Sequence, residues 1–216
     1  MSDFVLDWER EARTGVAEAV LCEGKSVAQV EAILAEAGSR RLLLTRLAPE
    51  PHAALAAPLR ATLDYDPLSR TAFHGAPKVP VVAGAGIVCA GTSDLPVARE
   101  AARSLQFAGF ASPVIADVGV AGLWRLMKRL DEIRAFRVVI AVAGMEGALF
   151  SVIAGLVQAP VIAVPTSVGY GVAAGGHVAL NSALATCATG VVAVNIDNGY
   201  GAACAAIRML GRAGAA

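Results

Sequence analysis

The sequence has no Asp, Glu, Lys or Arg between Glu146 and Asp197, a run of 50 uncharged residues in a chain of which 17% is charged. An unbroken apolar run of about 18 residues or more would indicate a transmembrane helix. Proline and glycine, the strongest sequence signals for turns, interrupt this run. The interrupting residues are Pro160, Pro165, Gly169, Gly171, Gly175, Gly176 and Gly190. We therefore expect no membrane span.

Other absences narrow the class of protein. The formal net charge is zero, which gives no electrostatic argument for a nucleic acid or an anionic membrane as partner. The four cysteines show no CxxC spacing, and the chain does not resemble a small secreted disulfide scaffold. The charged N-terminus lacks the apolar core of a secretory signal. We therefore expect a cytoplasmic protein.

The residues from 77 to 216 have the pattern of alternating strands and helices. Strands are predicted at 86–91, 113–117, 138–144, 160–165 and 191–197. Helices are predicted at 96–109, 121–133, 146–158, 175–188 and 201–212. The strands are apolar throughout, which is typical of parallel strands covered on both faces. The pattern predicts an α/β fold with a doubly wound, five-stranded parallel sheet in three layers.

Residues 1–76 are predicted to form a separate small α/β domain, since most of the charged residues and two of the three histidines lie there. The pattern predicts helices at 7–13 and 26–37, with Ser26 as N-cap of the second, and a strand at 40–47. Lys25 lies in the turn Cys-Glu-Gly-Lys, which fits either a solvated turn or an anion-binding loop.

The two helices predicted between Glu146 and Asp197 carry no charge on any face. A surface helix normally has a polar stripe, so we expect both to be buried partly by their own sheet and partly by other subunits. The sequence therefore predicts a homo-oligomer, in an even-numbered closed assembly.

Ligands of doubly wound sheets bind outside the carboxyl ends of the strands, so the segments that follow the strands are the candidate site. They are 91–94, 117–122, 144–147, 165–171 and 197–201. Ser93 and Asp94 fit an ordinary helix N-cap or a site for phosphate or carboxylate. Glu146, a lone carboxylate among uncharged residues, is either a solvated loop residue or an acid-base group. The Gly-Ala-Gly at 84–86 precedes its strand, which argues against a Rossmann dehydrogenase.

Cys187 lies late in the helix predicted at 175–188, where a cysteine is most often a small buried hydrophobic residue. The same interpretation applies to Cys22, Cys89 and Cys204. His177 follows Gly176 at a helix start and could cap, stack or catalyse.

Several segments together resemble the carboxylases of nickel-pincer nucleotide biosynthesis, the LarB-type family. They are GTSDLPVAREA, ADVGVAGLWRL, VAGMEGALFSVIAGLV, PVIAVPTSVGYG, LNSALATCA and VNIDNGYGAA, with REARTGVAEAVLCEGKS and LLLTR in the first domain. The chain is more distantly similar to the PurE-type aminoimidazole ribonucleotide carboxylases and mutases. That family has a histidine in the third motif, where this chain has Met145 and Glu146. This difference argues against purine carboxylase activity.

The resemblance implies an enzyme that carboxylates the pyridinium C5 of nicotinic acid adenine dinucleotide with carbon dioxide or bicarbonate. Hydrolysis of the phosphoanhydride by water would release AMP and leave pyridinium-3,5-biscarboxylate mononucleotide, which leads to the cofactor of lactate racemase. The resemblance implies no tightly bound organic cofactor, leaves open a Mg²⁺ ion for the hydrolysis with unknown ligands, and is compatible with an octamer. Alternatives are a purine-type carboxylase or mutase and a non-catalytic nucleotide-binding regulator.

The family motifs place the thiol nucleophile at Cys187 and the active-site carboxylates at Glu146 and Asp94. They imply that substrate is bound by Thr92, Ser93, Gly144, Met145, Gly147, Thr166, Ser167, Gly169, Tyr170, Asn198, Lys25 and Arg46. A thiolate suits the reaction because it adds readily to an electron-poor ring and leaves readily. Helix topology places Cys187 far from the carboxyl ends of its own sheet. We therefore expect either an early helix end or delivery of Cys187 by a neighbouring subunit.

Overall fold

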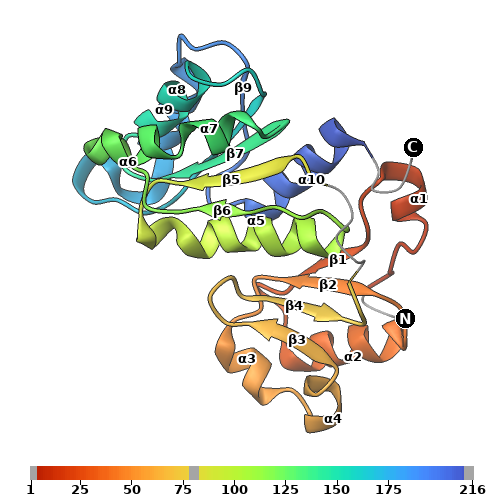
Figure 1. The fold of residues 1–216 in the computed structure, drawn as a ribbon. Helices are drawn as coiled ribbons and strands as arrows, with labels where there is room; N and C mark the ends of the chain where they lie inside the picture. The colour runs from red at the N-terminus through yellow and green to blue at the C-terminus, as the bar shows by residue number, and fades with distance from the viewer. Residues whose placement is uncertain (1–3, 78–82, 212–216) are drawn as a thin grey trace.

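The computed structural model describes residues 4–77 and 83–211, which form two β-sheets (Figure 1). The domain boundary predicted near residues 77–80 falls mostly outside the described residues. No helix among the described residues has the length and apolar character needed to cross a membrane.

The first sheet is four-stranded in the described part of the chain, with the order β1-β2-β4-β3. Its strands are Ala19–Leu21 (β1), Leu42–Thr45 (β2), Leu63–Asp66 (β3) and Thr71–His74 (β4). One face packs on helices Val27–Ala37 (α2), Pro49–Ala54 (α3) and Ala57–Arg60 (α4). The Ser26 hydroxyl accepts a hydrogen bond from the amide of Gln29, whose side chain accepts one from the amide of Ser26. This capping box confirms the predicted N-cap.

The second sheet contains five described strands, all parallel, in the order β6-β5-β7-β8-β9. They are Ala85–Cys89 (β5), Val114–Ile115 (β6), Val138–Ala143 (β7), Val161–Pro165 (β8) and Val191–Ala193 (β9). The strands β5, β7 and β8 are buried along their whole length. The predicted doubly wound parallel sheet is therefore confirmed.

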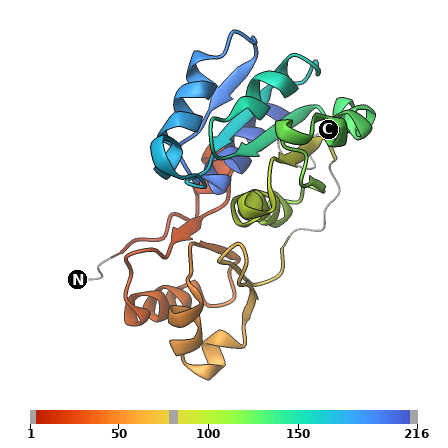
Figure 2. The same cartoon turned by 90° about the vertical axis from the view of Figure 1, so that its left-hand side faces the viewer.

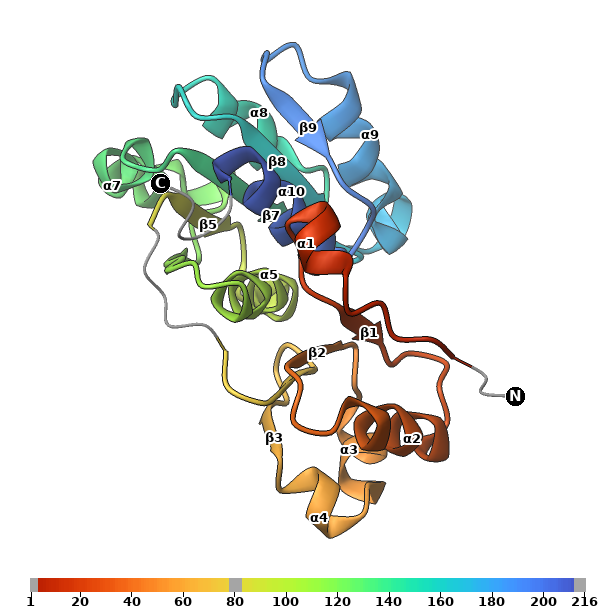
Figure 3. The same ribbon diagram turned by 90° about the vertical axis from the view of Figure 1, so that its right-hand side faces the viewer.

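Helices cover both faces of this sheet, as its apolar strands require. One face packs on Leu95–Phe107 (α5) and Gly199–Leu210 (α10). The other packs on Leu123–Lys128 (α6), Leu130–Arg134 (α7), Ala148–Ala154 (α8) and His177–Ala185 (α9). Short 3₁₀ segments are Thr92–Asp94 (η1), Val120–Gly122 (η2) and Gly171–Gly176 (η3). The remaining helix, Arg10–Thr14 (α1), lies beside α10 (Figure 3).

The helix predicted at 146–158 is too long, because α8 ends at Ala154. Two further helix predictions need correction. The helix predicted at 121–133 is split into α6 and α7, because Arg129 has a non-helical φ of −107°. The helix predicted at 175–188 ends at Ala185, because Thr186 is extended (φ −61°, ψ 137°). The Thr186 hydroxyl holds this end by hydrogen bonding to the Ser151 hydroxyl and accepting from the amide of Ala188. Cys187 therefore lies outside the helix in which it was predicted.

Helix α5 lies between the two sheets (Figure 2) and Arg103 is its main polar contact with the first sheet. The guanidinium is 8% exposed and donates to the Thr71 hydroxyl at 2.8 Å and to the carbonyl of Asp64 at 2.7 Å. It also lies 4.0 Å from the ring centroid of Phe73. The charge is thus buried but well partnered, as buried charges must be.

We expect Arg103→Ala to lower the free energy of unfolding by about 2 to 4 kcal/mol, because it removes a buried guanidinium with its hydrogen bonds to the Thr71 hydroxyl and the Asp64 carbonyl and its packing on the Phe73 ring. Urea denaturation followed by circular dichroism measures the change. Arg99→Ala is the matched control, since Arg99 lies one turn away on α5 and pairs with Asp66 at 2.8 Å. Its side chain is 52% exposed, so the loss should stay below about 1 kcal/mol. Equal losses in the two variants would contradict the role given to Arg103.

Candidate active site

The strand order reverses between β5 and β7, and a cavity of about 350 Å³ lies at their carboxyl ends. We call it the switch-point cavity, since ligands of doubly wound sheets bind at such a reversal. The loops after β5, β6 and β7 form its walls. Its polar and loop residues include Gly91, Ser93, Asp94, Asp117, Arg125, Gly144, Met145, Glu146 and Gly147. Six of the predicted substrate-binding and catalytic residues line this cavity: Ser93, Asp94, Gly144, Met145, Glu146 and Gly147.

Asp94 is held between two strand ends. It is 4% exposed, and its two carboxylate oxygens accept hydrogen bonds from the amide of Gly91 at 2.9 Å and from the Thr166 hydroxyl at 2.6 Å. Thr166 follows β8 and is fully buried. Both oxygens therefore have partners inside the protein. Through these hydrogen bonds, Asp94 and Thr166 can fix the positions of the loops that follow β5 and β8.

The loop that carries Glu146 has little freedom. Met145 adopts a left-handed backbone (φ 53°) and its amide donates to the carbonyl of Val168 at 2.8 Å. A Cβ at Gly144 would lie 2.2 Å from that carbonyl oxygen, so no larger residue fits there. Glu146 itself is exposed in the single chain, which is compatible with both interpretations that the sequence left open, a solvated loop residue and an acid-base group. Its backbone is fixed while its carboxylate remains accessible at the cavity.

Arg125 supplies positive charge to the switch-point cavity. Its Nη1 donates to the Asp117 carboxylate at 2.5 Å, and its buried Nε has no hydrogen-bond partner among the described residues. Asp117 has a left-handed backbone (φ 59°). Arg125 and Asp117 thus place a paired cation and anion at the wall of the switch-point cavity.

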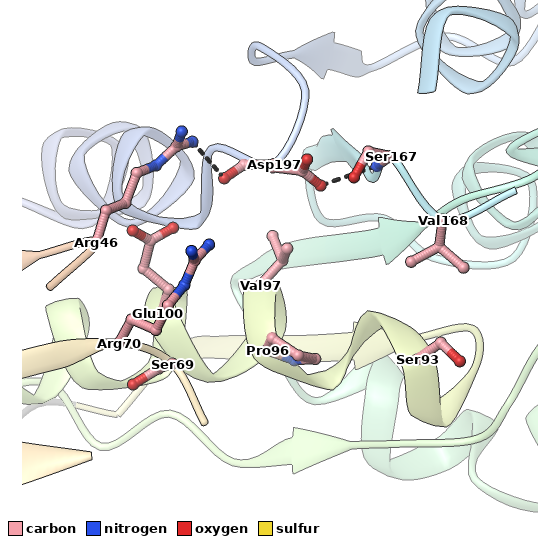
Figure 4. A pocket seen from close by; sticks show the side chains of 10 residues that line it. All are labelled: Arg46, Ser69, Arg70, Ser93, Pro96, Val97, Glu100, Ser167, Val168 and Asp197. Carbon is pink, nitrogen blue, oxygen red and sulfur yellow. Dashed lines mark hydrogen bonds between the residues drawn. The ribbon is translucent and has the colours of Figure 1, made fainter. Parts of the chain in front are cut away.

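A second cavity, of about 190 Å³, adjoins the first through Ser93 and Val168 (Figure 4). We call it the arginine cavity because Arg46 and Arg70 line it together with Glu100. Arg46 reaches it from the first sheet, and its Nη2 donates to the carbonyl of Asp197 at 2.9 Å. The two sheets thus build this cavity jointly.

A third cavity, of about 360 Å³, adjoins the second through Arg46 and Glu100. We call it the Tyr200 cavity; its other polar residues are Thr45, Asn195, Asn198 and Tyr200. The three cavities share lining residues in series and so form a row along the carboxyl edge of the second sheet. Such a row suits an elongated ligand with chemically different parts.

Backbone strain is concentrated along this row. Five described residues other than glycine have a positive φ, and all of them line the first or second cavity: Arg46, Arg70, Asp117, Met145 and Asp197. Residues in this conformation persist where the surrounding structure enforces them, and they cluster at functional sites. The strain supports the row of cavities as the functional site.

Glu100 is the most perturbed acid of the site. It is 5% exposed, and burial raises its pKa above the usual 4.5, although nearby Arg46 and the amides of Tyr200 and Gly199 oppose the shift. Its Oε2 accepts from the amide of Tyr200 at 3.3 Å. Sequence analysis missed Glu100 and Arg70. Glu100 could have been found from its position beside Ala101 on the buried side of α5, where a charged residue is unexpected.

Several predicted binding residues lie outside the three cavities. Of the others, Ser167 lines the arginine cavity and Asn198 lines the Tyr200 cavity. The predicted residues that line none of them are Lys25, Thr92, Thr166, Gly169 and Tyr170. Of the two cations predicted in the first domain, Arg46 lines a cavity and Lys25 does not. Tyr170 is 77% exposed and so is available to a further ligand or subunit.

Cys187 also lies outside the three cavities. It is exposed, four residues before Val191, which pairs with Val161 at the amino end of β8. The cavities lie at the opposite, carboxyl ends of the strands. The early end of α9 therefore does not bring Cys187 to the cavities of its own chain.

The described residues contain no group of three or more His, Cys, Asp or Glu side chains able to hold a metal ion. Within these residues no protein ligands are assigned to the Mg²⁺ that the resemblance leaves open.

The five-stranded parallel sheet with helices on both faces is a PurE-like fold. The family model described as AIR carboxylase matches residues 84–216, and the one described as LarB/PurE-like N-terminal domain matches residues 2–75. The chain belongs to the LarB-type carboxylase family, which is distantly related to PurE.

Individual relatives are more remote. The uncharacterized protein MJ0165 of Methanocaldococcus jannaschii is 49% identical over 119 residues, which are 54% of this chain and 45% of that protein. The chain therefore matches less than half the length of this relative. The crystal structures of PurE and of a PurE2 variant from Treponema denticola are both 22% identical to it. The TM-scores are 0.47 for PurE (60% of this chain and 80% of that chain) and 0.49 for the variant (59% and 79%).

Proposed function

We propose that the protein carboxylates the pyridinium ring of nicotinic acid adenine dinucleotide at C5 and hydrolyses the phosphoanhydride. The products are pyridinium-3,5-biscarboxylate mononucleotide, a precursor of the nickel-pincer cofactor, and AMP. The observation that carries the proposal is the pairing of a LarB-type first domain with a carboxylase domain whose switch-point cavity is lined by Glu146. Purine-type carboxylases have a histidine in this motif, where this chain has Met145 and Glu146, and this difference argues against purine carboxylase activity.

The row of cavities supports a dinucleotide substrate. The nicotinate ring would lie in the switch-point cavity beside Glu146, with Arg125 close enough to pair with an anionic group. The diphosphate would lie next along the row, between Arg46 and Arg70, since arginine suits bidentate contact with phosphate. The adenosine part would extend into the Tyr200 cavity.

The chemistry requires a nucleophile before carbon dioxide can react. A pyridinium ring is electron-poor, so a thiolate must first add to it and create an electron-rich carbon at C5. That carbon forms the bond to carbon dioxide, Glu146 then removes the C5 proton, and the thiolate leaves as the ring regains aromaticity. We assign the thiolate to Cys187 on the basis of its family motif.

A neighbouring subunit supplies Cys187 in this proposal, because Cys187 lies at the opposite end of the sheet from the cavities of its own chain. The outer surface of η3 and α9 exposes large apolar side chains in the single chain: Tyr170 is 77% exposed, Val172 94% and Leu184 70%. Apolar exposure of this kind is typical of protein interfaces. We therefore propose a homo-oligomer that buries this surface.

Incubation with nicotinic acid adenine dinucleotide and bicarbonate tests the function. We expect AMP by liquid chromatography and the biscarboxylate mononucleotide by mass spectrometry, with one carbon from labelled bicarbonate in the product. Recovery of the dinucleotide unchanged would contradict the proposal and indicate a binding regulator. Carboxylation of aminoimidazole ribonucleotide in a parallel incubation would instead indicate a purine-type enzyme.

A further inference from the structure

The arginine cavity holds a buried carboxylate that the proposed carboxylation does not use. Glu100 extends from α5 into the wall shared by the arginine and Tyr200 cavities. The amide of Tyr200 fixes its Oε2, and Gly199 packs so closely that a Cβ there would lie 2.9 Å from this oxygen. The carboxylate therefore has a backbone partner at the cavity wall and is 5% exposed.

The guanidinium groups of Arg46 and Arg70 flank this carboxylate (Figure 4). Neither forms an ion pair with Glu100 within the described part of the chain. Arg46 pairs instead with the exposed Glu23 at 3.0 Å. No described side chain pairs with Arg70. The two arginines can bind an anion while the Glu100 carboxylate stays free of an ion pair. General-base hydrolysis of a phosphate compound needs both: cations that bind the phosphate and a carboxylate that accepts the proton of water.

We propose that the arginine cavity is a second reaction centre, in which Arg46 and Arg70 bind the diphosphate and Glu100 accepts a proton from the attacking water. The proposal rests on the proposed function. The water oxygen forms a bond to one phosphorus, and the bond from that phosphorus to the bridging oxygen breaks. The electron pair of the broken bond goes to the departing phosphate, and the water proton goes to Glu100. The two arginines stabilise the charge on the departing phosphate.

The electrostatics of Glu100 suit this role. Burial raises its pKa above the ordinary value, which strengthens the carboxylate as a base, while Arg46 and Arg70 act in the opposite direction and keep it available as the anion. Asp197 and Tyr200 are the other titratable groups that line the two cavities. Glu100 is thus separate from Glu146, which serves the switch-point cavity.

The test is Glu100→Gln, an isosteric change that removes the base. With nicotinic acid adenine dinucleotide and bicarbonate we expect AMP release to slow by about 100-fold or more. The carboxylated dinucleotide should accumulate, or, if hydrolysis comes first, added nicotinic acid mononucleotide should be carboxylated at the wild-type rate. Glu36→Gln, at an exposed position on α2, is the matched control and should change neither reaction. Circular dichroism and thermal melting confirm that each variant is folded.

The pH dependence of AMP release shows whether Glu100 acts as a base or only as a structural residue. Wild-type AMP release should fall as pH drops through the pKa of Glu100, because the protonated acid cannot accept a proton. The residual rate of Glu100→Gln should not show this fall. Arg70→Gln should raise the KM for the dinucleotide and keep the acid limb but move it to higher pH, because Arg70 lowers the pKa of Glu100.

Two outcomes would overturn the inference. One is AMP release at the wild-type rate by folded Glu100→Gln. The other is loss of both half-reactions in that variant, including carboxylation of the mononucleotide. Failure of the wild type to release AMP or to carboxylate would instead reject the proposed function, so the two failures are distinguishable.

Discussion

Replacing Cys187 by serine is expected to abolish carboxylation, with a loss on the order of 10³-fold or more. A neutral hydroxyl is a poor nucleophile toward a pyridinium ring, and an alkoxide is not available near neutral pH. Because Cys187 is exposed in the single chain, the change should alter the folding stability of the subunit by no more than about 0.5 kcal/mol. Incorporation of labelled bicarbonate into the ring measures the loss.

Cys204→Ser is the matched control, since Cys204 lies on α10 and lines none of the three cavities, and should retain carboxylation. Mass spectrometry of the wild type with substrate should show a covalent adduct on the peptide that carries Cys187. The peptides of Cys22, Cys89 and Cys204 should show none, because burial raises the pKa of each of these thiols. Full carboxylation by folded Cys187→Ser would reject the thiolate mechanism.

Mixed oligomers test where Cys187 acts. Subunits with Cys187→Ser and subunits with Glu146→Gln are each expected to be inactive in carboxylation. If one subunit supplies Cys187 to the cavity of another, hybrids contain some sites with both native residues, and part of the activity returns on mixing. If each chain builds its own site, no hybrid site has both residues and mixing restores nothing.

The architecture of the second sheet could be predicted from the sequence because its physical cause is local. Runs such as Val138–Ala143 are apolar on both faces, and only a strand covered on both sides buries such a run. The glycines and prolines between the runs mark the turns. The position of Glu146 follows directly, since it comes three residues after the end of that strand.

The end of α9 could not be predicted from these patterns. The segment around Thr186 continues the apolar helical pattern, and the helix stops because a hydroxyl contact with Ser151 stabilises an extended residue. This contact joins residues 35 positions apart in sequence. The local sequence pattern around Thr186 therefore cannot predict this contact.

The arginine cavity escaped prediction for a similar reason. Arg46 and Arg70 follow strands of the first sheet, whereas Glu100 belongs to a helix of the second, so only the packing of α5 between the sheets brings them together. Lys25 and Arg46 were equivalent candidates in the sequence. The structure distinguishes them, because Arg46 hydrogen bonds to Asp197 and Lys25 lines none of the three cavities.

Replacing Glu146 by glutamine is expected to slow carboxylation by about 10² to 10⁴-fold, the usual contribution of a general base. The amide keeps the size of the side chain, and Glu146 is exposed in the single chain, so the fold should not change. Because Cys187 remains in place, the thiol adduct should still form, and it should accumulate after carbon dioxide has added. Glu132→Gln, at an exposed position on α7, is the control and should leave the rate unchanged.

Deuterium at C5 of the nicotinate ring shows whether Glu146 removes that proton. With Glu146→Asp, which keeps the acid but shortens its reach by one methylene, proton removal should become rate-limiting and show a primary isotope effect. With Glu146→Gln the residual reaction depends on water as the base, so its rate should rise with buffer base concentration. A wild-type rate in Glu146→Gln would remove Glu146 from the chemistry. In that case the strained loop at Met145 would serve only to shape the cavity around the nicotinate ring.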